Sequence, residues 1–372
     1  MNRSTLQSIA FTGFLGVGGG LLFQVLHLPL PWMLGPLTVI MFANLRSQKS
    51  KLALVWPIGF RNAGLIVLGY MLGISFTREA GWQILTQLPS MFLAAVFIII
   101  CGLILGVMIA RQTGISLPTS LVGSIPGGLT QMVVLAEEIE NIDITTVTFI
   151  QTIRLLTVVF TVPFLSLHFL AASPAIMQIA GTAGLAAGPD VAAVLGLTPE
   201  NILAFGAVVL FSTAVSVRLS FPTPYLIGPL LGAAALVLWG WPAPPVPPRL
   251  ITLAQVAVGA YMGLSMNLVS LQNWRKLLPY SLGFGLGIVF VALGIGYCLT
   301  LWHPLNLLTA FLATAPGGMT EMGVTAVAAG ADLSVVAAYQ LFRVLFILFV
   351  VPPLLKRGLP RLTAARLSHP GP

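Results

Sequence analysis

Long apolar segments recur along this chain and restrict what it can fold into. Many of them reach about twenty residues with few charges, which is the length a helix needs to cross a bilayer. Of the 372 residues, 57% are hydrophobic and 7% are charged, against roughly a quarter charged in a typical soluble domain. So few charges could not cover the surface of a soluble fold. The sequence therefore predicts an all-α integral membrane protein, and the lipid bilayer is its first expected partner.

Twelve apolar spans are expected to form membrane helices. They are 6–28, 31–45, 56–76, 89–110, 117–137 and 144–170, then 199–217, 224–240, 251–268, 279–301, 305–328 and 333–354. The spans 31–45 and 224–240 are short and each contains a Gly-Pro pair, so we expect broken or re-entrant helices there. The chain then divides into a membrane unit (6–170), a Gly/Ala-rich linker (171–198), a second membrane unit (199–355) and a basic tail (356–372).

The two membrane units share their motifs. Ser-Ile-Pro-Gly-Gly-Leu-Thr-Gln-Met at 124–132 matches Thr-Ala-Pro-Gly-Gly-Met-Thr-Glu-Met at 314–322. Three further pairs match in the same order: 31–37 with 224–230, 69–75 with 259–265, and Gln151/Arg154 with Gln340/Arg343. All the offsets lie between 189 and 193 residues. Chance similarity between apolar segments does not keep such order and spacing, so the sequence indicates two homologous repeats of about five to six helices each.

The number of crossings in each repeat decides how the two repeats are related. Six crossings make them parallel and put both termini on one side; eleven basic residues then lie on the cytoplasmic side and four lie opposite. That bias favours cytoplasmic termini. Five crossings, which a re-entrant 31–45 segment would give, would invert the second repeat, as in many transporters. Both alternatives are open at the level of sequence.

These motifs resemble those of the bacterial AbrB membrane family, which is distinct from the small DNA-binding protein of the same name. The resemblance covers about residues 10–355 and rests on the paired Pro-Gly-Gly blocks, the downstream Gln-x-x-Arg and the upstream Leu-Gly-Pro-Leu segment. It implies a multi-pass protein of the bacterial inner (plasma) membrane. Members of the family carry labels such as regulator of AidB expression and ammonia monooxygenase, and neither label specifies a mechanism.

The Pro-Gly-Gly blocks predict that the helices that contain them are broken or re-entrant. Proline removes a backbone donor, and each glycine costs roughly 1 kcal/mol relative to alanine inside a helix. A second half-helix would start near Leu129 and Met319 with free N–H groups and a positive dipole end, an arrangement that transporters use to bind anionic groups. Close helix packing through the glycines is the alternative. The candidate residues are Gly127, Gly128, Thr130, Gln131, Gly317, Gly318, Thr320 and Glu321.

Each repeat also places one arginine near the middle of a span. Arg154 stands eleven residues after Asp143, and Arg343 eleven after Asp332. An arginine that faces lipid at this depth costs at least ~2.5 kcal/mol, so both are expected to face the interior. Gln151 and Gln340 lie three residues earlier on the same helix faces. Each Gln–Arg pair could bind a solute, or could merely cap carbonyls of the broken helix.

The repeats differ chemically where Gln131 in the first corresponds to Glu321 in the second. A carboxylate in mid-membrane must be paired or protonated, so Glu321 is expected either to pair with an arginine or to carry a proton. Two arginines and one glutamate leave a formal charge of +1. A bound anion would balance that charge.

Other chemistries have little support in the sequence. The four histidines stand apart from other ligand residues, the two cysteines lie inside apolar runs, and no metal or cofactor site is expected. Phosphate-binding and dinucleotide motifs, a nucleophile elbow and catalytic residues are not found. The net charge of +8 comes from dispersed loop residues rather than a patch for nucleic acid.

We therefore expect a secondary transporter or exporter of a small anionic or zwitterionic solute, and no enzymatic activity. The alternative is a membrane-embedded regulator of gene expression, although no soluble effector segment is evident. An enzyme similar to ammonia monooxygenase is the least favoured interpretation. A homo-oligomer is compatible with the sequence.

Overall fold

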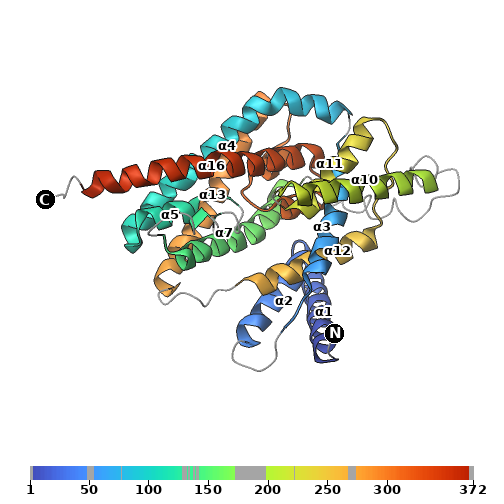
Figure 1. The fold of residues 1–372 in the computed structure, drawn as a ribbon, viewed down its shortest axis with the longest axis horizontal. Coiled ribbons are helices and arrows are strands. Elements are labelled where there is room, and N and C mark those ends of the chain that lie inside the picture. The colour runs from blue at the N-terminus through green and yellow to red at the C-terminus, as the bar shows by residue number, and fades with distance from the viewer. Residues whose placement is uncertain are drawn as a thin grey trace.

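The protein is built from helices. The computed structural model describes residues 3–47, 54–76, 78–127, 132, 135–136, 139, 142–171, 198–221, 223–266 and 274–367. In the first half the helices are α1 (Arg3–Val25), α2 (Pro31–Ser47), α3 (Ile58–Gly73), α4 (Arg78–Thr113), α5 (Leu117–Ser124) and α7 (Ile144–Leu165), with a π-helical turn η1 (Ser166–Leu170). In the second half they are α10 (Pro199–Arg218), α11 (Pro224–Leu238), α12 (Pro248–Ser265), α13 (Trp274–Trp302), α14 (Leu307–Thr314), α15 (Met319–Ala329) and α16 (Leu333–Leu367) (Figure 1).

Six helices of the described residues are long and apolar enough to cross a membrane: α1, α4, α7, α10, α13 and α16. Two shorter apolar helices, α3 and α11, accompany them. Large apolar side chains remain exposed along the long helices, as lipid-facing surfaces require. The predicted all-α membrane fold is confirmed.

Prolines are tolerated inside these helices more readily than the sequence analysis assumed. The spans expected to begin at Pro89 and Pro279 start earlier, because α4 and α13 run through these prolines. The Gly-Pro pairs at Pro36 and Pro229 likewise leave α2 and α11 as short, continuous helices. In a membrane, neighbouring helices can satisfy the backbone groups that a proline frees. Proline alone was therefore a poor marker of helix ends in this chain.

The boundaries between the predicted units are described only in part. Residues 172–197, which make up nearly all of the expected linker, lie outside the described residues. Helix α16 passes the expected end of the second unit and continues to Leu367, so most of the predicted basic tail extends the last helix.

The two ends of each Pro-Gly-Gly segment lie close together. Helix α14 ends at Thr314 and α15 begins at Met319, so the predicted break is confirmed in the second half of the chain. Beyond α15, the backbone N–H of Asp332 donates to Oγ1 of Thr309, at the start of α14, over 3.0 Å. The same contact joins the N–H of Asp143 to Oγ1 of Thr119, at the start of α5, over 3.0 Å. The ends of both segments therefore lie together, and α14 and α15 form a helical hairpin.

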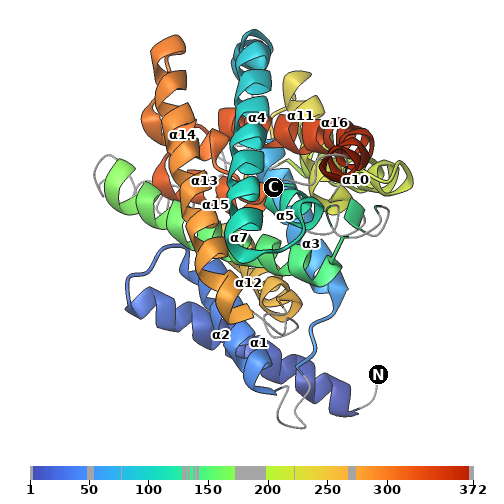
Figure 2. The same cartoon turned by 90° about the vertical axis from the view of Figure 1, so that its left-hand side faces the viewer.

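The helices pack into two bodies. We call α1, α2, α3, α10, α11 and α12 the scaffold, and α4, α5, α7, α13, α14, α15 and α16 the hairpin bundle. Within each body the helices pack extensively, whereas the contacts between bodies are few and mainly join α3 to α15 and α16, and α11 to α4. Figure 1 shows α1, α2 and α12 gathered at one end of the molecule, and Figure 2 shows α4 within the bundle.

The scaffold contains two matching contacts between the halves of the chain. A Cβ on Gly69 of α3 would collide with the carbonyl of Leu226 on α11, and a Cβ on Gly259 of α12 with the carbonyl of Met33 on α2. In both cases a helix of one half packs backbone against backbone on the short Gly-Pro helix of the other, as small residues permit in membranes. These reciprocal contacts tie the two halves into one scaffold.

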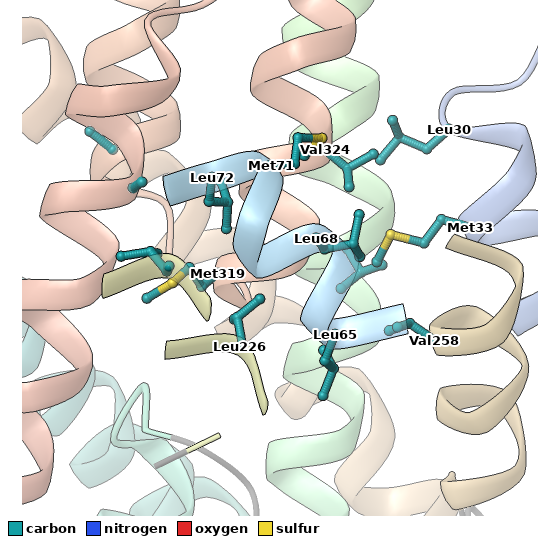
Figure 3. Packing of buried hydrophobic residues seen from close by; sticks show 14 of the residues in the cluster. Leu30, Met33, Leu65, Leu68, Met71, Leu72, Leu226, Val258, Met319 and Val324 are labelled. Atoms are coloured by element: carbon teal, nitrogen blue, oxygen red, sulfur yellow. The ribbon is translucent and has the colours of Figure 1, made fainter. Parts of the chain in front are cut away.

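One apolar core connects the scaffold to the bundle. Figure 3 shows Leu65, Leu68 and Leu72 of α3 between Val258 of α12 and Met319 at the start of α15. All five side chains are buried. Helix α3 is therefore the element through which the scaffold touches the tip of the α14–α15 hairpin.

Candidate functional site

The tip of the α14–α15 hairpin is an extended turn of Ala315-Pro-Gly-Gly. Gly318 has φ −73° and ψ 151° and is the N-terminal cap of α15, which begins at Met319 as expected. Thr320 and Glu321 lie in the first turn, where backbone N–H groups have no partner within the helix. The matching residues of the first repeat, Gly128, Thr130 and Gln131, lie outside the described residues.

Arg343 and Gln340 hold this tip from α16. The guanidinium of Arg343 donates from Nη1 to the carbonyl of Ala315 over 2.5 Å and from Nη2 to that of Gly317 over 2.7 Å. The amide of Gln340 donates to the carbonyls of Leu312 over 2.8 Å and Ala315 over 3.0 Å. Its Oε1 accepts from Nη2 of Arg343 over 2.5 Å, which orients the guanidinium. Carbonyl groups freed by the break are thus satisfied by side chains.

Arg154 and Gln151 make the corresponding contacts from α7. Arg154 donates to the carbonyls of Ile125 over 3.0 Å and Gly127 over 3.1 Å, and Gln151 donates to that of Ile125 over 2.9 Å. Both arginines face the protein interior, with 3% of Arg154 and 6% of Arg343 exposed. The alternative that these side chains cap carbonyls near the break is therefore observed in both halves of the chain.

Both Pro-Gly-Gly segments line one cavity of about 250 Å³. The predicted residues on its wall are Gly127, Gln151, Arg154, Gly317, Gly318, Thr320, Glu321 and Arg343. Gln340 supports the hairpin without lining the cavity. The opposite wall comes from the scaffold and includes Arg61, Leu65, Thr223, Leu226, Val258 and Met262. The cavity therefore lies between the two bodies.

Glu321 is the one carboxylate on the described wall of this cavity. Its side chain is 3% exposed, and its Oε2 accepts no hydrogen bond from the described residues. A Cβ on Gly318 would overlap this oxygen, so the carboxylate lies against the N-terminal cap of its own helix. The ion pair with an arginine that the sequence analysis considered is not formed among the described residues. The positive end of α15 is the nearest favourable charge.

Arg61 was not predicted as a site residue. It was counted only among the basic residues expected on the cytoplasmic side of the membrane. It lies in the first turn of α3 with its guanidinium carbon 5.0 Å from the centroid of the Tyr261 ring on α12, and it lines the cavity. The stacking holds the arginine beside the site without neutralising it. The sequence could have indicated this role, because Arg61 lies inside the expected span 56–76 and an ionisable residue within a membrane span often marks a functional site.

Metal ligation gains no support from the described residues, in which no group of three or more His, Cys, Asp or Glu side chains lies close enough to hold an ion.

Comparison with known proteins places the chain in a family. The family model described as "Transition state regulatory protein AbrB" matches residues 32–358. The protein named "Uncharacterized protein YhjN" from Bacillus subtilis (strain 168) is 25% identical over 358 residues, covering 91% of this chain and 90% of its own length. The protein named "Putative regulator AbrB" from Escherichia coli (strain K12) is 25% identical over 332 residues, covering 89% of this chain and 90% of its own. With a family match across most of its length and both Pro-Gly-Gly segments lining one cavity, this chain belongs to the AbrB membrane family.

Proposed function

We propose that this protein is a secondary transporter or exporter of a small anionic or zwitterionic solute, and that it is not an enzyme. The observation that supports the proposal is the cavity of about 250 Å³ at which both Pro-Gly-Gly segments meet, with Arg61, Arg154, Arg343 and Glu321 on its wall. Interrupted helices that meet around charged residues are the common form of a solute site within a membrane. The volume lies just below the roughly 300–1,000 Å³ of sites for drug-sized ligands, which fits a small solute.

The two-body architecture supports a transport cycle. Every predicted site residue on the cavity wall belongs to the hairpin bundle, while the facing wall belongs to the scaffold. Contacts within each body are extensive and contacts between them are few. Movement of the bundle against the scaffold would carry the site from one side of the membrane to the other without breaking either body, which is how many secondary transporters alternate access.

The hairpins also suggest a topology. Helix α14 has eight residues, which at ~1.5 Å rise per residue gives about 12 Å, under half of the ~30 Å hydrocarbon core. A hairpin of this depth ends near mid-membrane and does not count as a crossing. Among the described helices, each half then has five crossings, namely α1, α2, α3, α4 and α7 in the first and α10, α11, α12, α13 and α16 in the second. An odd number inverts the second half relative to the first.

The distribution of Lys and Arg supports the inverted arrangement. Of the 17 basic residues, fifteen remain when the buried Arg154 and Arg343 are set aside. With cytoplasmic termini and ten crossings, only Arg78 and Arg249 lie on the outer side, and thirteen lie on the cytoplasmic side. These are Arg3, Arg46, Lys49, Lys51, Arg61, Arg111, Arg218, Arg275, Lys276, Lys356, Arg357, Arg361 and Arg366. This bias is stronger than the eleven to four of the parallel arrangement.

The same topology assigns a direction to the cavity. Arg61 begins α3 and Thr223 precedes α11, and both of these helix ends would face the cytoplasm. Both residues line the cavity together with the hairpin tips. The conformation described here would therefore be the one in which the site is open to the cytoplasm of a bacterial cell, with the protein in the inner membrane.

A membrane-embedded regulator of gene expression is the second candidate, because the similar protein from E. coli bears the name of a regulator. Transport and regulation predict different results in a purified system. A transporter moves its solute into liposomes unaided, whereas a regulator needs its partners.

The test begins with the purified full chain and a thermal-shift screen of small carboxylates, inorganic anions and amino acids. A ligand at 100 times its dissociation constant should stabilise the protein by about 2.7 kcal/mol. Stabilising compounds are then offered in labelled form to liposomes that contain the protein. Uptake that is absent from protein-free liposomes and is reduced by Arg154→Gln supports transport. Binding without flux in either direction favours the regulator, and stoichiometric metal in the purified protein would reopen the oxygenase interpretation.

A further inference from the structure

We infer that the solute is a small zwitterion with an apolar side chain, of the class of the aliphatic α-amino acids. This inference rests on the proposed function and narrows it. The cavity offers three kinds of surface at once, namely a carboxylate, guanidinium groups and an apolar wall. Each of them corresponds to one part of such a molecule.

The carboxylate on the cavity wall favours a solute with a positively charged group. Glu321 forms no ion pair among the described residues, although three arginines line the same cavity. A buried carboxylate without a cationic partner is costly, and a solute ammonium group would supply that partner. A simple anion would instead bring a second negative charge beside Glu321. Among anionic and zwitterionic solutes, the carboxylate therefore favours the zwitterions.

The guanidinium groups on the cavity wall favour a solute that also has an acidic group. Arg61, Arg154 and Arg343 against Glu321 give the described wall a formal charge of +2. Arg154 and Arg343 donate hydrogen bonds to backbone carbonyls, whereas among the described residues Arg61 donates only to the neighbouring Asn62 side chain, over 3.3 Å. Arg61 is thus the guanidinium with the most capacity left for a carboxylate. It stands on the scaffold, whereas Glu321 stands on the bundle.

The scaffold wall calls for an apolar side chain. Leu65, Leu226, Val258 and Met262 line the cavity from α3, α11 and α12. Polar solutes such as phosphate or a short dicarboxylate would leave this surface in contact with water, whereas an aliphatic side chain would cover it. The zwitterionic head and the apolar body of one small molecule therefore match all three surfaces.

Four related probes separate the three contributions. Leucine carries all the groups, isocaproate lacks only its ammonium, isoamylamine lacks only its carboxylate, and glycine lacks the apolar side chain. Titration calorimetry on the purified full chain should rank leucine first, with each of the other three weaker by at least about tenfold. Isocaproate or glycine binding as tightly as leucine would overturn the inference. So would a different solute class that binds while leucine does not, although the transporter proposal would then stand. The absence of any binding or flux across the whole screen would contradict the transporter proposal itself.

Two variants assign the contributions to residues. Glu321→Gln should lower the affinity for leucine at least about tenfold. The affinity for isocaproate should stay the same or rise, because isocaproate has no ammonium group. Met262→Gln should reduce the difference in affinity between leucine and glycine. Leu253→Gln, on an exposed face of the same helix, is the matched control. Ratios between probes do not depend on how much of a variant folds. Equal loss of leucine and isocaproate in Glu321→Gln would overturn the assignment.

Discussion

Nη2 of Arg343 lies 2.7 Å from the carbonyl oxygen of Gly317, so a side chain from the last long helix closes the tip of the neighbouring hairpin. The corresponding atoms of Arg154 and Gly127 are 3.1 Å apart in the other half. These contacts show what a break in a membrane helix requires, which is a partner for each carbonyl that the break frees. Mutations that remove these contacts therefore test stability, whereas mutations of other cavity residues test solute binding.

Replacing Arg343 by Gln should destabilise the protein. The shorter side chain leaves the carbonyl of Gly317 without its donor, and a buried group without a partner costs about 1–3 kcal/mol. We expect a lower melting temperature in detergent for Arg343→Gln and for Arg154→Gln. Arg249→Gln, which removes an exposed arginine from α12, is the control and should melt with the wild type. Equal melting of Arg343→Gln and wild type would show that the contact is dispensable.

Replacing Glu321 by Gln should leave stability unchanged or raise it. Glu321 makes no ion pair with the described residues, so its loss strands no guanidinium. The ion-pair alternative predicts the reverse, because a buried arginine would lose its counter-charge. Melting temperatures of wild type, Glu321→Gln and Arg343→Gln, measured side by side, decide between the two. If the melting temperature falls as far in Glu321→Gln as in Arg343→Gln, the ion-pair interpretation is correct.

The same variant should flatten the pH profile of solute binding. A carboxylate attracts an ammonium group only when ionised, so wild-type binding should strengthen as pH rises through the titration of Glu321. The other charged groups on the described wall are Arg61, Arg154 and Arg343. Affinities of leucine at several pH values, compared between wild type and Glu321→Gln, give the result. An unchanged profile in the variant would assign the titration to another group.

Gly318→Ala should disturb the site without disturbing the fold. Gly318 has ordinary extended dihedral angles, so its backbone accepts a side chain, but a Cβ would overlap Oε2 of Glu321. That atom ends a flexible side chain and can move at little cost, and its movement takes the carboxylate from the helix N-terminus. We expect a near-normal melting temperature and weaker binding of leucine. Gly294→Ala, where a Cβ meets nothing within 4 Å, is the matched control.

Arg61→Gln should weaken solute binding by about tenfold, equivalent to ~1.4 kcal/mol, with little effect on stability. Arg61 is only partly buried, and within the described part of the chain its side chain interacts with the Asn62 side chain and the Tyr261 ring. Tyr261→Leu should lower affinity less, because it releases the arginine without removing it. Calorimetry with leucine measures both changes. Full affinity in Arg61→Gln would place the acidic group of the solute elsewhere.

Sequence patterns predicted the helices better than their arrangement. The span 144–170 agrees with α7 and η1 to the residue, because Asp143 caps its start and no internal glycine interrupts it. The break before Met319 followed from Pro-Gly-Gly in the same way. The sequence left open whether the Pro-Gly-Gly helices are only broken or also re-entrant, since the return of the chain depends on contacts such as Asp332 with Thr309, which are distant in sequence. The place of Arg61 depends on how scaffold and bundle pack, which local patterns do not encode.

The inverted topology makes a prediction at Arg218, Arg275 and Lys276, the three basic residues whose side of the membrane differs from the parallel arrangement in favour of the cytoplasm. With five crossings in each half, the connections that follow α10 and α12 lie in the cytoplasm, as do both termini. Single cysteines at Ser220 and Trp274, in a chain without Cys101 and Cys298, should then resist an impermeant thiol reagent applied to intact cells and react after the membrane is opened. A cysteine at Trp241, after α11, should react in intact cells and serves as the opposite control. Labelling of Ser220→Cys from outside would restore six crossings in the first half and parallel repeats, and the cavity would then no longer be assigned to the cytoplasmic side.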